Sequence, residues 1–173
     1  MGEAATHPRS GTLVIGVGNS LMGDDGLGIA AVEHFRDGWV VPDDVALVDG
    51  GTWGLNLLPL VEQAEHVIFV DAIRRDEEPG TLTLLEGADL PSYLSMKLSP
   101  HEVDLRDVLA LAELRGTLPS DICVIGLEPA AVHLSTRLSP LLECMLPRLY
   151  TAIAAQLETW GHRCCRRDEA RRA

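Results

Sequence analysis

Among the side chains that can bind divalent metal ions, four lie at positions that suggest a site: Asp24, Asp25, Asp71 and His101. Two carboxylates and one imidazole suit a borderline ion such as Ni²⁺ or Zn²⁺, and they leave coordination positions open for a substrate ligand. Each residue type also has a structural interpretation. Aspartates at the start of a helix stabilise it by about 0.3–1 kcal/mol each, a carboxylate after a strand can cap the next turn, and a lone histidine before a helix is commonly a surface or capping residue. The residues alone leave metal binding and capping open.

The glycine-rich stretch Gly16–Gly28 raises nucleotide binding as an alternative. The dinucleotide fingerprint GxGxxG is incomplete, because Leu21 occupies the third glycine position, and no GK[ST] phosphate loop is present. Asp24 and Asp25 would also repel a pyrophosphate. GxSxG and HExxH motifs are absent as well, so serine hydrolases and zincins find no support.

Short apolar runs predict strands, and apolar residues at helical spacing predict the helices between them. We expect strands at residues 12–18, 45–48, 66–71, 81–85 and 122–127. We expect helices from about residue 26 to before Pro42, and at 55–62, 104–114 and 140–159. This order predicts an α/β fold with a mostly parallel sheet covered by helices on both faces.

Three of the expected strands end in residues that could build a site. They are followed or closed by Gly18 and Asn19, by Asp49, Gly50 and Gly51, and by Asp71. In parallel sheets functional residues gather at the carboxyl ends of the strands, so we expect these residues to share one edge. The segment Asp49–Gly51 is interpreted first as a tight turn, and at this edge it could also shape a peptide cleft.

Charge and composition limit the possible partners. The formal net charge is −12, Lys97 is the single lysine, and the segment from Arg163 to Arg172 holds five of the 14 basic residues. This balance argues against nucleic acid, which requires clustered Lys and Arg. The acidic body could attract a metal ion or a basic peptide, or simply form a solvated surface.

The chain of 173 residues suits one domain. We expect a flexible lead-in over 1–11, a single domain over 12–160 and a disordered tail over 161–173. The four cysteines form no CxxC pair, and Cys123 lies in an apolar run typical of the core. No apolar stretch is long enough to span a bilayer, so we expect a cytoplasmic protein without a membrane partner. No helix is evident as an interface, so we expect a monomer.

Four blocks of the sequence resemble those of the [NiFe]-hydrogenase maturation proteases. They are GVGNSLMGDDGLG at Gly16–Gly28, DGGTWG at Asp49–Gly54, VDAI at Val70–Ile73 and LSPH at Leu98–His101. The blocks follow the family's order at about its spacing, and the resemblance extends from about Thr12 to Thr159. The resemblance implies a three-layer αβα sandwich with a twisted, mostly parallel five-stranded sheet.

The resemblance also implies a function and a site. Family members are endopeptidases that remove the C-terminal extension of a hydrogenase large-subunit precursor after nickel insertion. Asp25, Asp71 and His101 are the implied catalytic and metal-contacting residues, and Asp24 is the less expected ligand of the acidic pair. Asp49, Gly50 and Gly51 are implied to line the substrate cleft. The nickel is presented by the precursor, and no organic cofactor is implied.

Two further interpretations stay open beside the nucleotide-binding one. The chain could be a nickel-dependent binding module or chaperone that does not cut the hydrogenase subunit. It could also be a related germination-type protease with another substrate. The chemical step is open too: a metal-polarised carbonyl, a metal-activated water or a carboxylate acting as general base would each fit.

Overall fold

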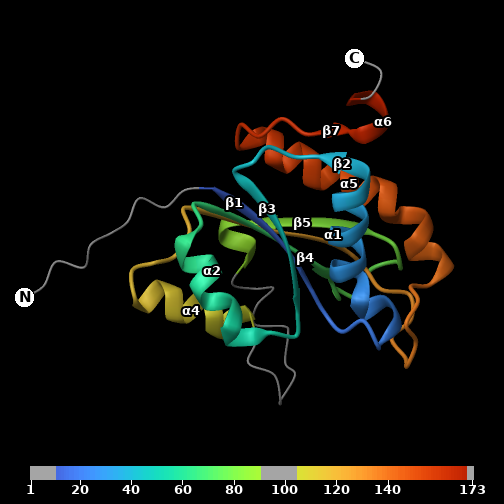
Figure 1. Cartoon of the computed structure of the whole chain (residues 1–173). Helices are drawn as coiled ribbons and strands as arrows, with labels where there is room; N and C mark the ends of the chain where they lie inside the picture. The colour runs from blue at the N-terminus through green and yellow to red at the C-terminus, as the bar shows by residue number, and fades with distance from the viewer. Residues whose placement is uncertain (1–10, 91–104, 171–173) are drawn as a thin grey trace, which may run out of the picture.

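The computed structural model describes residues 11–90 and 105–170, and its centre is a five-stranded sheet (Figure 1). The strands lie in the order β3 (Val45–Gly51), β1 (Thr12–Val17), β4 (His66–Ala72), β6 (Asp121–Leu127) and β5 (Leu82–Glu86). The first four are mutually parallel, and β5 pairs antiparallel with β6. The prediction of a mostly parallel five-stranded sheet is confirmed.

Helices cover both faces of this sheet and give the three-layer αβα arrangement (Figure 1). One face carries α1 (Leu27–Gly38) and α5 (Pro140–Thr159), and the other carries α2 (Leu58–Gln63) and α4 (Leu105–Leu114). Short 3-10 turns precede α1 and α2 and follow β5, at Gly23–Gly26 (η1), Gly54–Leu57 (η2) and Gly87–Asp89 (η3).

Strand β4 shows why the central strands are continuous apolar runs. Ile68 and Val70 belong to the core cluster under α1 and α5, whereas Val67 and Phe69 belong to the cluster under α2 and α4. A parallel strand buried on both faces needs apolar side chains at every position. The run therefore fixes β4 in the middle of the sheet, and Asp71 follows it directly.

The segment after α5 differs from the expected disordered tail. His162 contacts the Thr12 hydroxyl at 2.7 Å, and β7 (Cys165–Arg166) pairs antiparallel with β2 (Trp39–Val40). A short helix, α6 (Arg167–Ala170), follows. A two-residue pairing between segments so far apart leaves no periodic pattern in the sequence, so nothing in the sequence indicated these contacts.

The other boundaries agree with the expectations to within a few residues. Helix α1 ends at Gly38, earlier than its expected limit before Pro42, because the chain turns into β2. Residues 1–10 of the expected lead-in, and His101, lie outside the described part of the chain. Among the residues described, no helix is long and apolar enough to cross a membrane.

Candidate functional site

The carboxyl ends of three parallel strands meet where the sequence predicted. In the register of the sheet, Gly16 of β1 lies opposite Asp49 of β3 and opposite Val70 of β4, the residue before Asp71. Just beyond, Val17 pairs with Gly51. The predicted convergence of these segments on one edge is confirmed.

Asp71 is a buried carboxylate at this edge. Its side chain is 1% exposed, and its Oδ1 accepts a hydrogen bond of 2.8 Å from the backbone N–H of Ala72. Its backbone is pressed against the neighbouring strand, since a Cβ atom at Gly126 would collide with the carbonyl oxygen of Asp71. Strand pairing on this side therefore holds Asp71 firmly in place.

Gly18 lies close to the backbone of Asp25 and to the carboxylate of Asp71. Its φ is +128°, a backbone conformation that residues other than glycine rarely adopt. A Cβ atom there would collide with the carbonyl oxygen of Asp25 and would lie 3.9 Å from Oδ1 of Asp71. The absence of a side chain at Gly18 thus lets the loop carrying Asp25 approach the end of β4.

Asp25 faces this junction from a more open position. Its side chain is half-buried, and the backbone N–H of Asn19 donates both to its Oδ2 at 3.1 Å and to its carbonyl oxygen at 3.2 Å. These bonds fold the loop between β1 and α1 back on itself. Asp25 as a whole residue is therefore partly accessible to solvent, unlike Asp71.

Asp24 has a different role from its neighbour. Its side chain is 0% exposed; Oδ2 accepts from the backbone N–H groups of Ala130 at 2.9 Å and Ala131 at 2.8 Å, and Oδ1 accepts from that of Ser139 at 2.6 Å. The interpretation of one aspartate as structural is supported, although the backbone groups it binds lie beyond β6 and at the start of α5. Asp24 therefore fastens the loop after β6 to the loop after β1.

Helix α1 starts close against the sheet because of two glycines. A Cβ atom at Gly28 would collide with the carbonyl oxygens of Val17 and Val70, and one at Gly16 would collide with that of Gly28. Bulkier residues would push the helix away from β1 and β4. The glycines of the first loop thus serve close packing beside the two carboxylates.

The segment after β3 borders the same junction. The N–H of Gly18 donates to the carbonyl of Gly51 at 3.1 Å, and the N–H of Trp53 donates to the carbonyl of Gly50 at 2.9 Å. The register of β1 and β3 shifts here, and Asp49 is exposed. Strand β3 thus continues through Gly51, past its expected end at Val48, and the chain turns only at Thr52. A part for this segment in substrate binding stays a prediction.

The third member of the predicted metal site cannot be placed. His101 lies outside the described residues, and within 11–90 and 105–170 no group of three His, Cys, Asp or Glu side chains could hold a metal ion. Within the described residues, the backbone of Asp25 and the carboxylate of Asp71 both lie close to Gly18. The three-residue site stays a prediction.

Cys123 does not supply an alternative nucleophile. It is fully buried in β6, as its apolar surroundings predicted. Burial, and secondarily the Glu86 carboxylate, raise the pKa of the Cys123 thiol to about 12. The thiol therefore stays protonated near neutral pH and behaves as a small apolar side chain.

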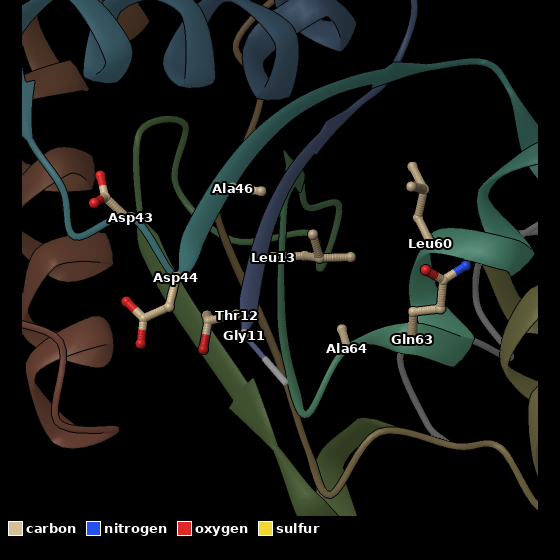
Figure 2. A pocket seen from close by; sticks show the side chains of 9 residues that line it. All are labelled: Gly11, Thr12, Leu13, Asp43, Asp44, Ala46, Leu60, Gln63 and Ala64. Atoms are coloured by element: carbon tan, nitrogen blue, oxygen red, sulfur yellow. The ribbon is translucent and has the colours of Figure 1, made fainter. Parts of the chain in front are cut away.

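A pocket of about 350 Å³ is shown in Figure 2, and neither Asp25 nor Asp71 is among the residues that line it. Its lining includes Thr12 at the start of β1, Asp44 just before β3 and Gln63 at the end of α2. These positions mark the amino-terminal ends of the parallel strands. The pocket is therefore at the opposite edge of the sheet and is not part of the candidate site.

The loop from Pro129 to Ser139 was missed in the sequence. Besides the bonds to Asp24, Ser135 donates its N–H to the carbonyl of Leu21 at 2.9 Å and accepts from the N–H of Gly23 at 2.8 Å. The only available signal was its position after the fourth parallel strand, β6, whose end must lie at the same edge.

Comparison with known proteins agrees with this architecture. A family model described as hydrogenase maturation protease matches residues 29–156. The chain is 35% identical over 149 residues to hydrogenase 2 maturation protease of Escherichia coli K12, covering 85% of this chain and 91% of that protein. It is 36% identical over 151 residues to the hydrogenase expression/formation protein HupD of Rhodobacter capsulatus, covering 86% and 72%. The solved structure of the hydrogenase maturating endopeptidase HybD from E. coli superposes with a TM-score of 0.87 at 32% identity, covering 92% of this chain and 99% of that one.

Proposed function

Since the chain belongs to the hydrogenase maturation protease family, we propose that it removes the C-terminal extension of a [NiFe] hydrogenase large-subunit precursor once nickel has been inserted. Proteins similar to it are named maturation proteases and endopeptidases, which are hydrolases. The substrate, the nickel dependence and the residue roles are parts of the proposal.

The proximity of Asp25 and Asp71 to Gly18 is the observation that supports the proposed function most directly. Asp25 lies in the turn η1 and Asp71 lies in strand β4. The backbone carbonyl of Asp25 and Oδ1 of Asp71 both approach Gly18, whose loop conformation only glycine accepts readily. Asp71 is fixed and buried, whereas Asp25 is half-exposed. A fixed inner carboxylate and an accessible outer one suit a group that a docking protein presents.

In the proposal, nickel already bound in the precursor is part of the substrate. Asp25, Asp71 and His101 complete its coordination and so hold the scissile peptide bond at the edge of the sheet. Carboxylate oxygens and imidazole nitrogen are ligands that suit a borderline divalent ion. Cleavage is a hydrolysis: the oxygen of water bonds to the carbonyl carbon, the C–N bond breaks, and the leaving nitrogen takes up a proton.

Two sources of activation fit this arrangement. The nickel could act as a Lewis acid on the scissile carbonyl or on the attacking water, or one of the carboxylates could take the proton from that water. In either case the segment Asp49–Gly51 borders the junction through the bond between Gly18 and Gly51. We assign it to binding the substrate chain, because its glycines permit close backbone approach.

The experiment compares precursor cleavage by the wild type with that by Asp25→Asn, Asp71→Asn and His101→Ala. Asp43→Asn is the matched control, because Asp43 is exposed and lines the pocket at the opposite edge (Figure 2). We expect each site variant to lose about 100-fold or more in cleavage rate, and the control to keep it. Folded site variants that cleave as fast as the wild type would refute these roles.

A further inference from the structure

Two leucines lie exposed beside the candidate site. The side chain of Leu21, in the loop after β1, is 56% exposed, and that of Leu134, in the loop after β6, is 82% exposed. Met22 and Ser135 form a parallel β-bridge, and the N–H of Ser135 donates to the carbonyl of Leu21 at 2.9 Å. The residues preceding the bridge, Leu21 and Leu134, are therefore neighbours on the surface. We call them the leucine pair.

The leucine pair is held on a rigid base. Asp24 binds three backbone N–H groups, those of Ala130, Ala131 and Ser139, and so ties the two loops together from within. A carboxylate that is 0% exposed is tolerated only because these donors satisfy it. The leucines are thus presented in set positions, and binding would require little ordering of these loops.

The leucine pair is also continuous with the candidate site. Asn19, two residues before Leu21, donates its N–H to Asp25. The same short loop therefore carries an exposed apolar side chain and a half-exposed carboxylate. A polypeptide whose scissile bond lies at Asp25 and Asp71 must pass over or beside this loop.

The two stretches that carry the leucines are themselves uncharged, although Asp24 and Asp25 follow the first and Arg137 follows the second. In a chain of net charge −12, the stretches 12–23 and 129–136 contain no Asp, Glu, Lys or Arg. Single exposed apolar side chains are common on protein surfaces. Two adjacent ones on clamped, uncharged loops favour an apolar partner over a basic one.

We propose that Leu21 and Leu134 form the docking surface for an apolar stretch of the precursor polypeptide next to its scissile bond. This inference rests on the proposed function and adds to it where the substrate chain is gripped. The leucines determine substrate affinity and the choice of precursor, whereas Asp25 and Asp71 act at the bond itself.

The test uses the full chain with Leu21→Ser, Leu134→Ser and the double variant. The matched control is Leu114→Ser, because Leu114 is 84% exposed and ends α4 on the other face of the sheet. KM and kcat are measured with nickel-loaded precursor, and Kd is measured with the same precursor. We expect KM and Kd to rise about tenfold for each single variant while kcat stays within about twofold. The reason is that serine lacks most of the apolar surface that each leucine would bury against the bound precursor. Leu114→Ser should match the wild type.

Three results separate this inference from the proposed function. Wild-type cleavage with unchanged KM and Kd in both leucine variants would overturn the docking surface and leave the protease intact. If the wild type cleaves no precursor, the proposed function fails, and Kd alone decides the docking surface: weakened binding supports it and unchanged binding overturns it. A wild-type dimer that Leu134→Ser dissociates would identify a second copy of the chain as the occupant and overturn the proposal.

Discussion

At the residue scale, Asp24 and Asp25 are chemically identical neighbours in opposite surroundings. Asp24 is buried and accepts three backbone N–H groups, whereas Asp25 is half-exposed and accepts its side-chain bond from Asn19. Burial therefore separates a structural aspartate from one that can meet a substrate, a distinction that residue type alone does not provide.

This difference predicts opposite phenotypes. Asp24→Asn places an amide N–H where only acceptors fit and should lower the free energy of unfolding by about 2–4 kcal/mol. Asp25→Asn should change it by less than about 1 kcal/mol, yet abolish most precursor cleavage. Urea denaturation followed by circular dichroism measures the first quantity. Equal losses of stability in the two variants would contradict the assignment.

Gly18 gives a second prediction at this scale. Gly18→Ala places a Cβ atom against the carbonyl of Asp25 at a φ of +128°, so we expect a loss of about 2–4 kcal/mol in stability, together with lower cleavage. Gly38→Ala is the control, because a Cβ at the end of α1 meets nothing within 4 Å. It should be neutral or stabilise by up to about 1 kcal/mol. Similar melting temperatures for the two variants would contradict the proposed junction.

At the element scale, the strands were predictable because their environment shapes their composition. Strands β1, β4 and β6 are buried on both faces and so are continuous apolar runs, and the order of strands and helices gave the parallel topology. That topology placed Asp71 and Asp49 at one edge. The partners of Asp24 could not be predicted, because Ala130, Ala131 and Ser139 lie 106, 107 and 115 residues further along.

The contacts of the segment after α5 could not be predicted for a related reason. Its order depends on β2 and on Thr12, which the local sequence does not reveal. His162 also pairs with Asp44 at 3.4 Å, near the amino-terminal ends of the strands. These contacts place the segment at the edge opposite the carboxylates.

We therefore expect removal of residues 161–173 to lower the stability of the fold and to leave the cleavage reaction unchanged. Loss of the β2–β7 pairing and of the His162 contacts should lower the free energy of unfolding by about 1–2 kcal/mol. The cleavage rate should stay within about twofold of the full chain. Thermal denaturation and the precursor assay measure the two quantities. An unchanged melting temperature, or lost cleavage in a folded truncated chain, would contradict this division.

At the scale of the whole molecule, the two edges of the sheet carry different features. The carboxyl edge carries Asp25, Asp71 and the leucine pair, and the amino edge carries the final segment and the pocket of Figure 2. An aliphatic core with a sheet buried on both faces keeps the carboxyl edge rigid. We propose that this edge cuts a polypeptide in response to the nickel that the polypeptide carries.

Intact-mass spectrometry of a hydrogenase large-subunit precursor, before and after incubation with the wild-type chain, tests this claim most directly. The precursor is supplied in nickel-loaded and metal-free forms. We predict that a C-terminal fragment is lost only from the nickel-loaded form. Cleavage of both forms would contradict the nickel-dependent mechanism, and an unchanged mass of nickel-loaded cognate precursor would contradict the proteolytic function itself.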